Sequence, residues 1–329
     1  MQGWRVVWPE RAKVALEEFT VPEPGPRQVL VETEATLISP GTERAFLLGL
    51  PNTSCRFPTG AGYNQVGWIA AVGAEVTDLQ VGDRVASTAN HASHAVLSAD
   101  RVLPVPEGLT SEQAVFFNLG GIALQGIRKA RLELGEAVLV LGQGLIGLLA
   151  LQVARLSGGF PVIGADVSEW RLQVARRCGA DEVLNPQQEG FAQRLAAATG
   201  GGGPAVVIEA TGHPEPINTA FRLAAGHGRV VLLGSTRGET EAVNFYRDVH
   251  RKGLTILGAH NSVRPERDSA PGFWTWRDDA ELMLNLLARG RFVLDPLITH
   301  RLPAAQAPEA YQMLLDWKEE LLGVVLKWK

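Results

Sequence analysis

The sequence has few cysteines, and the two present are far apart. Cys55 and Cys178 are the only cysteines in 329 residues, and neither belongs to a C-x-x-C motif. This spacing excludes a disulfide framework and a cysteine-built zinc knot, and it favours a reducing compartment. The sequence also lacks a long apolar run. Its most apolar stretch, residues 137–151, is shorter than the roughly 18 residues that span a bilayer and contains glycines.

An excess of one charge is lacking as well. The formal net charge is −4 and no long basic run occurs, so nothing indicates a nucleic-acid or membrane partner. The segment that starts at Met1 shows no basic stretch followed by an apolar one, which is the pattern of a secretory signal. We therefore expect a cytoplasmic protein that acts on a small-molecule substrate.

The composition is that of an ordinary globular protein, with 46% apolar and 20% charged residues, and the length allows two domains. Short β-rich runs separated by turns fill the first part and predict a β-barrel-like unit. After residue 134 strands and helices alternate, which predicts a parallel doubly wound sheet. The tail, from residue 297, shows a strand, a helix from roughly Ala304 to Trp317 and a strand, and is expected to rejoin the first unit. We predict an α/β fold with a β-rich domain at 1–120 and 292–329 and a domain with the parallel doubly wound sheet at 121–291.

A glycine-rich hexapeptide opens the expected α/β domain. Gly142, Gly144 and Gly147 follow an apolar run, and an apolar helical segment begins with Leu145 and Ile146. Three glycines at this spacing permit a tight turn, close approach to a pyrophosphate, and close packing of helix on strand. The alternative is an ordinary strand-turn-helix connection, because glycine turns also arise for structural reasons.

An acid at the expected end of the second strand strengthens this prediction. Asp166 lies about twenty residues beyond the glycines, where a carboxylate accepts hydrogen bonds from a ribose. A carboxylate there repels a ribose 2'-phosphate, so NAD is favoured over NADP. Val167 is expected beside the ribose, and Arg171 is either a ribose or phosphate contact or an exposed helical arginine.

Several segments together resemble the medium-chain dehydrogenase/reductase superfamily over nearly the entire chain. In order, they are Gly41-Thr42-Glu43, Val72-Gly73-Ala74, Val81-Gly82-Asp83-Arg84-Val85, the glycine hexapeptide, Cys178-Gly179-Ala180-Asp181 and Glu209-Ala210-Thr211-Gly212. The resemblance implies a GroES-like catalytic domain joined to a Rossmann domain. It also implies backbone contacts to the nicotinamide at positions that follow successive strands: Thr211, Gly212, Gly234, Ser235, His260 and Asn261.

The zinc chemistry of the alcohol-dehydrogenase relatives is expected to be absent. The positions that match their catalytic zinc ligands hold Pro40, Tyr63 with Asn64, and Leu119, and the four-cysteine structural lobe is missing. Proline and leucine cannot ligate zinc, and tyrosine with asparagine would be a poor substitute for imidazole or thiolate. The segments 38–44 and 62–67 are most similar to the zinc-independent, bacteriochlorophyllide-dehydrogenase-like branch.

Without a metal, organic donors must stabilise the charge on the substrate oxygen during hydride transfer. The resemblance places Tyr63 and Thr42 around that oxygen, so we expect Tyr63 to exchange the proton, Thr42 to relay it, and Asn64 to orient the oxygen. Each residue has a structural alternative. Tyr63 could pack in the core, Thr42 could cap a helix beginning at Glu43, and Asn64 could hold a turn. His91 is a second candidate acid or base or a turn histidine, and Asn118 is a substrate contact or a local backbone partner.

The stretch 261–278 is too long for a minimal connection and contains Trp274 and Trp276. It is either a lid whose aromatic faces suit a sugar or polyol, or a subunit contact. The resemblance also implies a homodimer, because the last strand of the Rossmann sheet, near 254–258, often pairs across a two-fold axis.

The leading interpretation is an NAD-dependent dehydrogenase of a secondary alcohol or ketone, with a sugar or polyol as one candidate substrate. Two alternatives stay open. One is an NAD(P)H-dependent reductase of an activated C=C bond, which the acid at Asp166 disfavours. The other is a non-catalytic NAD-binding protein, which would leave the nicotinamide unchanged with every substrate.

Overall fold

The computed structural model describes residues 1–316 and 320–329 and divides into two compact units. Unit 1 comprises Met1–Asn118, Met283–Gly290 and Ile298–Lys329, and unit 2 comprises Leu119–Leu282 and Arg291–Leu297. The domain boundaries expected from the sequence remain a prediction, because compactness does not show that either part folds alone.

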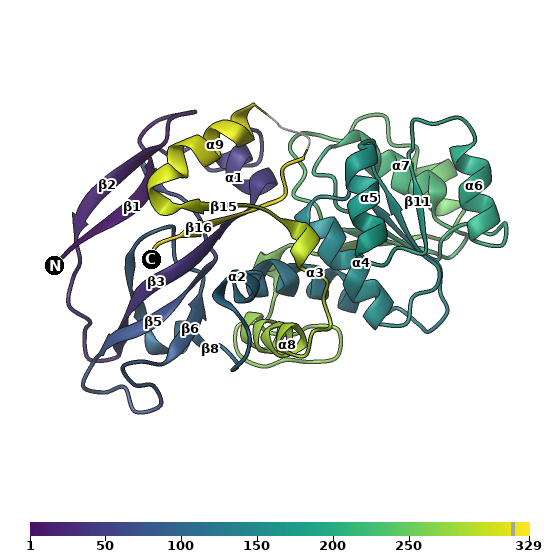
Figure 1. The fold of residues 1–329 in the computed structure, drawn as a ribbon. Coiled ribbons are helices and arrows are strands. Elements are labelled where there is room, and N and C mark those ends of the chain that lie inside the picture. Colours follow the sequence, from purple (N-terminus) through teal and green to yellow (C-terminus); the bar gives the residue numbers. More distant parts are fainter. Residues whose placement is uncertain (317–319) are drawn as a thin grey trace. The chain divides into compact units, whose positions relative to one another are not determined.

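Unit 1 is built mainly of strands (Figure 1). In its described residues one sheet has the order β15-β16-β3-β5-β6-β8, with β7 also paired to β3, and a smaller sheet has the order β2-β1-β4. The strands are β1 (Gln2–Trp8), β2 (Ala15–Thr20), β3 (Gln28–Ile38), β4 (Thr59–Gly60), β5 (Gln65–Val72), β6 (Arg84–Ser87), β7 (His94–Ser98), β8 (Leu103–Pro104), β15 (Ile298–Pro303) and β16 (Gly323–Lys327).

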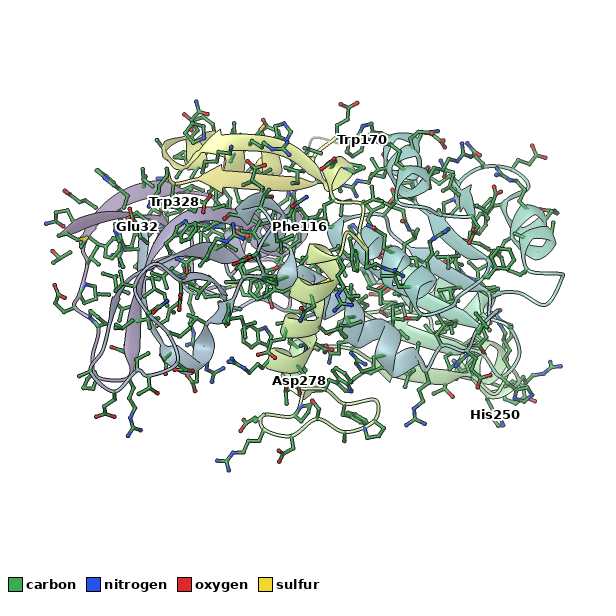
Figure 2. All side chains as sticks on the ribbon, turned by 60° about the horizontal axis from the view of Figure 1, so that its bottom comes forward. Glu32, Phe116, Trp170, His250, Asp278 and Trp328 are labelled. Atoms are coloured by element: carbon green, nitrogen blue, oxygen red, sulfur yellow. The ribbon has the colours of Figure 1, made fainter. Side chains whose placement is uncertain are left out.

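The tail joins this sheet as expected. Strand β16 pairs antiparallel with β3 and parallel with β15. Trp328 follows β16, and its backbone N–H donates to the Glu34 carbonyl at 3.0 Å; Figure 2 labels Trp328 beside Glu32. The expected helix of the tail is shorter than predicted: α9 spans Ala307–Leu315 after a 3-10 turn at Ala304–Gln306, and Trp317 lies outside the described residues.

In unit 1, helix α9 packs on the sheet through a buried apolar core. Tyr311 of α9 is fully buried together with Ile38, Leu47 and Leu326. Leu47 ends α1 (Pro40–Leu47), whose N-cap is Ser39, so Thr42 lies inside the first turn and does not cap a helix beginning at Glu43. The short helix α2 spans Ser111–Ala114.

Unit 2 contains a parallel six-stranded sheet with the order β11-β10-β9-β12-β13-β14. Numbered from β9, this order is 3-2-1-4-5-6, the order of doubly wound dinucleotide-binding sheets. The prediction of an α/β fold with a parallel sheet is therefore confirmed. The strands are β9 (Val138–Leu141), β10 (Val162–Ala165), β11 (Glu182–Leu184), β12 (Val206–Glu209), β13 (Arg229–Leu232) and β14 (Thr255–Gly258).

Helices pack on this sheet because its strands are apolar on both faces. Every residue of β9, β10 and β12 is buried, which is typical of parallel strands covered on two sides. The helices that contact the sheet are α4 (Leu145–Leu156), α5 (Glu169–Arg177), α6 (Phe191–Ala198) and α7 (Glu215–Leu223). Two further helices belong to both units: α3 (Phe117–Ala130) begins in unit 1, and α8 (Trp276–Ala288) ends there. Among the described residues, no helix combines the length and apolarity needed to cross a bilayer.

Candidate functional site

The glycine turn connects β9 to α4 and is fixed by close backbone packing. Gly142 has φ +88°, and a β-carbon there would lie 2.9 Å from the Thr211 backbone. A β-carbon on Gly147 would collide with the Gly142 carbonyl oxygen. At Gly144, the N-cap of α4, no atom would meet a β-carbon, and no side chain caps the helix. The first turn of α4, with Leu145 and Ile146, thus leaves backbone N–H groups available to an anion.

Asp166 follows β10 and is held by two backbone donors. Its carboxylate accepts the N–H of Gln143 at 2.7 Å and the N–H of Ser168 at 2.9 Å. Ser168 caps α5 through the Arg171 N–H. The Nε atom of Arg171 is buried and has no hydrogen-bond partner in the described part of the chain, while Val167 is exposed.

The loops after β12, β13 and β14 lie at the same edge of the sheet, because parallel strands end together. Gly212 has φ +75°, and a β-carbon on Gly234 would lie 2.8 Å from the Gly212 nitrogen, so these two turns pack closely. Ser235 follows Gly234. His260 is exposed, its Nδ1 atom lies 2.8 Å from the Ser262 hydroxyl, and Asn261 opens a 3-10 turn.

These observations fit a dinucleotide. At Gly144 no atom of the described residues lies within 4 Å of a β-carbon position, and the helical N–H groups that follow can bind a pyrophosphate. Asp166 is positioned to accept bonds from a ribose hydroxyl. The orphaned Arg171 Nε is a buried donor in need of an acceptor.

In unit 1, two asparagines hold the backbone around Tyr63. Asn64 is fully buried, donates to the Leu37 carbonyl at 3.2 Å, and accepts a bond from the Asn118 amide at 3.2 Å. Asn118 also donates to the Tyr63 carbonyl at 3.3 Å. Tyr63 and Thr42 are half-buried. The structure therefore brings Tyr63, Asn64 and Asn118 together.

Glu43, His91 and Tyr311 form a buried chain of polar groups. His91 Nε2 lies 3.1 Å from Glu43 Oε2, and the Tyr311 hydroxyl donates a short bond to the same oxygen. Glu43 Oε1 accepts the Ser39 N–H at 2.7 Å. Burial, followed by the Glu43 charge, raises the pKa of Tyr311 well above its ordinary value. A β-carbon on Gly62 would lie 2.5 Å from the His91 ring, so the segment before Tyr63 packs on that ring.

Two of the positions that match the relatives' catalytic zinc ligands carry no side-chain atom that can bind a metal. Pro40 has no donor, Leu119 is fully buried and apolar, and the Asn64 amide is used by Leu37 and Asn118. Within the ranges that the structure describes, no group of three or more His, Cys, Asp or Glu residues is arranged to hold a metal ion.

The segment 261–278 is anchored at several points in unit 2. Arg264 donates to the Gly121 carbonyl at 2.7 Å and forms an ion pair with the fully buried Asp279. The Arg128 guanidinium lies 3.7 Å from the centre of the Trp274 ring and also pairs with Asp279. Figure 2 shows Asp278 beside the loop that precedes α8. One face of Trp274 is thus occupied by Arg128, while Trp276 is the half-buried first residue of α8.

Sequence reasoning missed three acidic or phenolic groups of these sites. Glu43 and Glu209 lie in two of the segments that resemble the superfamily, but the sequence alone indicates no role for either side chain. Tyr311 occupies the buried face of an apolar helix, where a tyrosine gives no signal of its partner. An acid directly after a run of apolar residues, as at Glu209, is the one signal that could have been used.

Comparisons with known proteins agree with this architecture. Residues 25–118 match the alcohol dehydrogenase GroES-like domain, and residues 146–275 match the zinc-binding dehydrogenase family. The chain is 30% identical over 258 residues to a D-guloside 3-dehydrogenase of Shigella flexneri, covering 78% of this chain and 73% of the relative.

Two solved structures share the fold. A zinc-binding dehydrogenase from Sinorhizobium meliloti 1021, bound to NADP, has TM-score 0.85 and 23% identity, and the match covers 99% of each chain. An alcohol dehydrogenase from E. coli CFT073, complexed with NADH, has TM-score 0.85 and 22% identity with the same coverage.

The two matched domains and the glycine turn define an oxidoreductase that uses a nicotinamide cofactor. The chain belongs to the medium-chain dehydrogenase/reductase superfamily of the zinc-type alcohol dehydrogenases. It is an NAD(P)-dependent enzyme with a GroES-like domain and a Rossmann domain.

Proposed function

We propose that this enzyme is a zinc-independent, NAD-dependent dehydrogenase that interconverts a secondary alcohol and its ketone, with a sugar or polyol as substrate. The observation that carries the proposal is the Gly142 turn with Asp166 at the next strand end, which suits NAD. The likeness to a D-guloside 3-dehydrogenase supports a sugar-like substrate.

The preference for NAD over NADP rests on charge. The backbone N–H groups of Gln143 and Ser168 donate to the two carboxylate oxygens of Asp166 and hold them at the end of β10. A 2'-phosphate would meet this carboxylate, whereas a free ribose would donate to it. Arg171 contributes the second polar group of this ribose site.

Proton exchange is assigned to unit 1. When bound, the nicotinamide supplies or accepts the hydride, and Tyr63 gives or takes the proton of the substrate oxygen. Thr42 relays the proton. Asn64 and Asn118 hold the Tyr63 backbone, which keeps the phenol in one orientation. The His91 ring packs against Gly62 and is hydrogen-bonded to Glu43, so His91 positions the segment that carries Tyr63.

Independence from zinc follows from the side chains at the ligand positions. Pro40 and Leu119 carry no donor atom, and the Asn64 amide is engaged with the backbone of β3. The similarity to the bacteriochlorophyllide-dehydrogenase-like branch, noted from residues 38–44 and 62–67, is consistent with this proposal.

The contribution of Tyr63 is tested by Tyr63→Phe. The variant should turn over alcohols at least about a hundredfold more slowly, because it loses the acid-base group, while NADH binding stays unchanged. Tyr246→Phe, which alters an exposed phenol in unit 2, is the matched control. Undiminished turnover in Tyr63→Phe would remove this residue from the mechanism.

We further propose a cytoplasmic homodimer. Both cysteines are free, which suits a reducing compartment. Among the described residues, strand β14 is the edge strand of the parallel sheet, and its Ile256 is 37% exposed, so this edge is available to pair with a second copy. Sedimentation of the purified protein as a monomer would contradict the dimer.

A further inference from the structure

Glu209 ends β12, in the middle of the parallel sheet, and its side chain is fully buried. Its Oε1 atom accepts two bonds from Thr211, one from the backbone N–H at 2.8 Å and a short one from the hydroxyl. Its Oε2 atom is buried and has no hydrogen-bond partner among the residues that the structure describes. A buried carboxyl oxygen without a donor is costly when charged and far less costly when it carries a proton.

No ion pair joins Glu209 to a described residue, so no cation compensates a negative charge there. Burial raises its pKa, opposed only by the two Thr211 bonds. Strand β9 carries no titratable residue. The titratable residues on the other elements that pack against β12 are Arg155 of α4, Glu215 and Arg222 of α7, and Arg229 of β13; those on the loops at its end are His213, Arg237, Glu239 and Glu241.

Three of these arginines have other side-chain partners. Arg229 pairs in register with Val206, at the far end of β12, and forms an ion pair with Glu136. Arg155 is in the last turn of α4 and pairs with Asp181. The Arg222 guanidinium donates to the Thr219 hydroxyl at 3.0 Å.

Glu209 also shapes the dinucleotide turn. The Thr211 hydroxyl, which donates to Glu209, accepts the His213 N–H at 3.1 Å. A β-carbon on Gly142 would lie 2.9 Å from the Thr211 nitrogen and Cα atom, so the two turns are in contact. The turn that Glu209 orders is therefore packed against the turn that receives the pyrophosphate.

We propose that Glu209 is a proton-linked positioning residue of the dinucleotide site: the site binds NADH tightly only while Glu209 carries its proton. This inference rests on the proposed use of a nicotinamide dinucleotide at the Gly142 turn. The pyrophosphate is an anion, and a second negative charge buried beside its turn opposes binding in a medium of low dielectric. Binding therefore stabilises the protonated carboxyl, and a proton is taken up from solvent.

The sign of the pH dependence follows from this linkage. As pH rises through the pKa of Glu209 in the free protein, an increasing fraction of molecules must gain a proton to bind. The Kd for NADH should then rise, approaching about tenfold per pH unit. NADH is the suitable probe because its reduced nicotinamide carries no charge that would perturb other groups.

The experiment is titration calorimetry with NADH between about pH 5.5 and about pH 9, each pH in two buffers with different ionisation enthalpies. Wild-type protein should take up a fraction of a proton that rises with pH, and its Kd should rise in parallel. Glu209→Gln keeps an oxygen acceptor for Thr211 but cannot titrate. It should take up no proton and keep the low Kd at every pH. Glu215→Gln, six residues away in sequence and exposed, is the matched control and should behave as wild type.

A Kd that is independent of pH, with no proton uptake by wild-type protein, would overturn the inference while leaving dinucleotide binding intact. The same proton uptake in Glu209→Gln as in wild type would also overturn it. If Glu209→Gln does not fold, Thr211→Val replaces it: the variant removes the hydroxyl bond that lowers the pKa of Glu209, so the rise in Kd should move to higher pH. A rise at the same pH as in the wild type would overturn the inference. Failure of wild-type protein to bind NADH or NADPH at any pH would instead contradict the proposed function itself.

Discussion

A single carboxylate joins distant parts of unit 1. Glu43 accepts bonds from the Ser39 backbone and the Tyr311 hydroxyl, and it contacts the His91 ring. All three side chains of this chain of polar groups are buried, so each loses water and depends on the others. Hydrogen bonds to charged groups in such a setting stabilise more than bonds between neutral groups.

Tyr311→Phe is expected to destabilise the protein by about 1.5–3 kcal/mol, because it removes one donor from a buried carboxylate. The change is measured as the free energy of unfolding in denaturant. Tyr246→Phe, at a phenol that is 67% exposed, serves as the control. Equal unfolding midpoints for the two variants would show that the Tyr311 hydroxyl contributes no net stability.

Asp166→Asn is expected to shift the cofactor preference toward NADP by about tenfold or more, because the repulsion of a 2'-phosphate is removed. The amide oxygen can still accept the Gln143 or Ser168 N–H, so the turn should persist. The measurement is the ratio of Kd values for NADPH and NADH in variant and wild type. A ratio that does not change would exclude Asp166 from cofactor selection.

At the scale of elements, the spacing of apolar residues predicts the long helices and the buried strands. Helix α4 begins at Leu145, the residue at which the sequence predicts the apolar helical segment to begin. Strand β2, with a mostly exposed pattern, gave no signal because its alternation is weak. The predicted tail helix begins three residues too early, because the 3-10 turn at 304–306 consists of alanine and glutamine, which also favour an α-helix.

The packing of α4 on the glycine turn depends on one missing β-carbon. Gly147→Ala would press its methyl group into the Gly142 carbonyl, and overpacking of this kind costs about 1–3 kcal/mol. We expect the Kd for NADH to rise at least about tenfold, since the turn must move away from the helix. Gly202→Ala, in a surface loop with no atom near its β-carbon, is the control and should bind as wild type. Normal binding by Gly147→Ala would show that the turn tolerates this displacement.

At the scale of the whole molecule, fold class and cofactor class were predictable from sequence because they rest on local patterns. The glycine turn and the acid at Asp166 lie in short segments, and the alternation of strands and helices predicts the parallel sheet; the strand order is known only from the structure. The Glu43, His91 and Tyr311 chain was not predictable, because it joins residues 48 and 268 positions apart from Glu43. The contacts of Arg128 with Trp274 and Asp279, which hold the segment 261–278, could not be predicted either, because Arg128 lies far from both residues in sequence.

The central claim is that this superfamily member transfers hydride without a metal. The direct measurement is NADH formation from a panel of sugars, polyols and secondary alcohols, with protein dialysed against a chelator and analysed for bound zinc. The account predicts full turnover by the metal-free protein and no gain when zinc is added. Loss of turnover on chelation, with recovery on adding zinc, would contradict it.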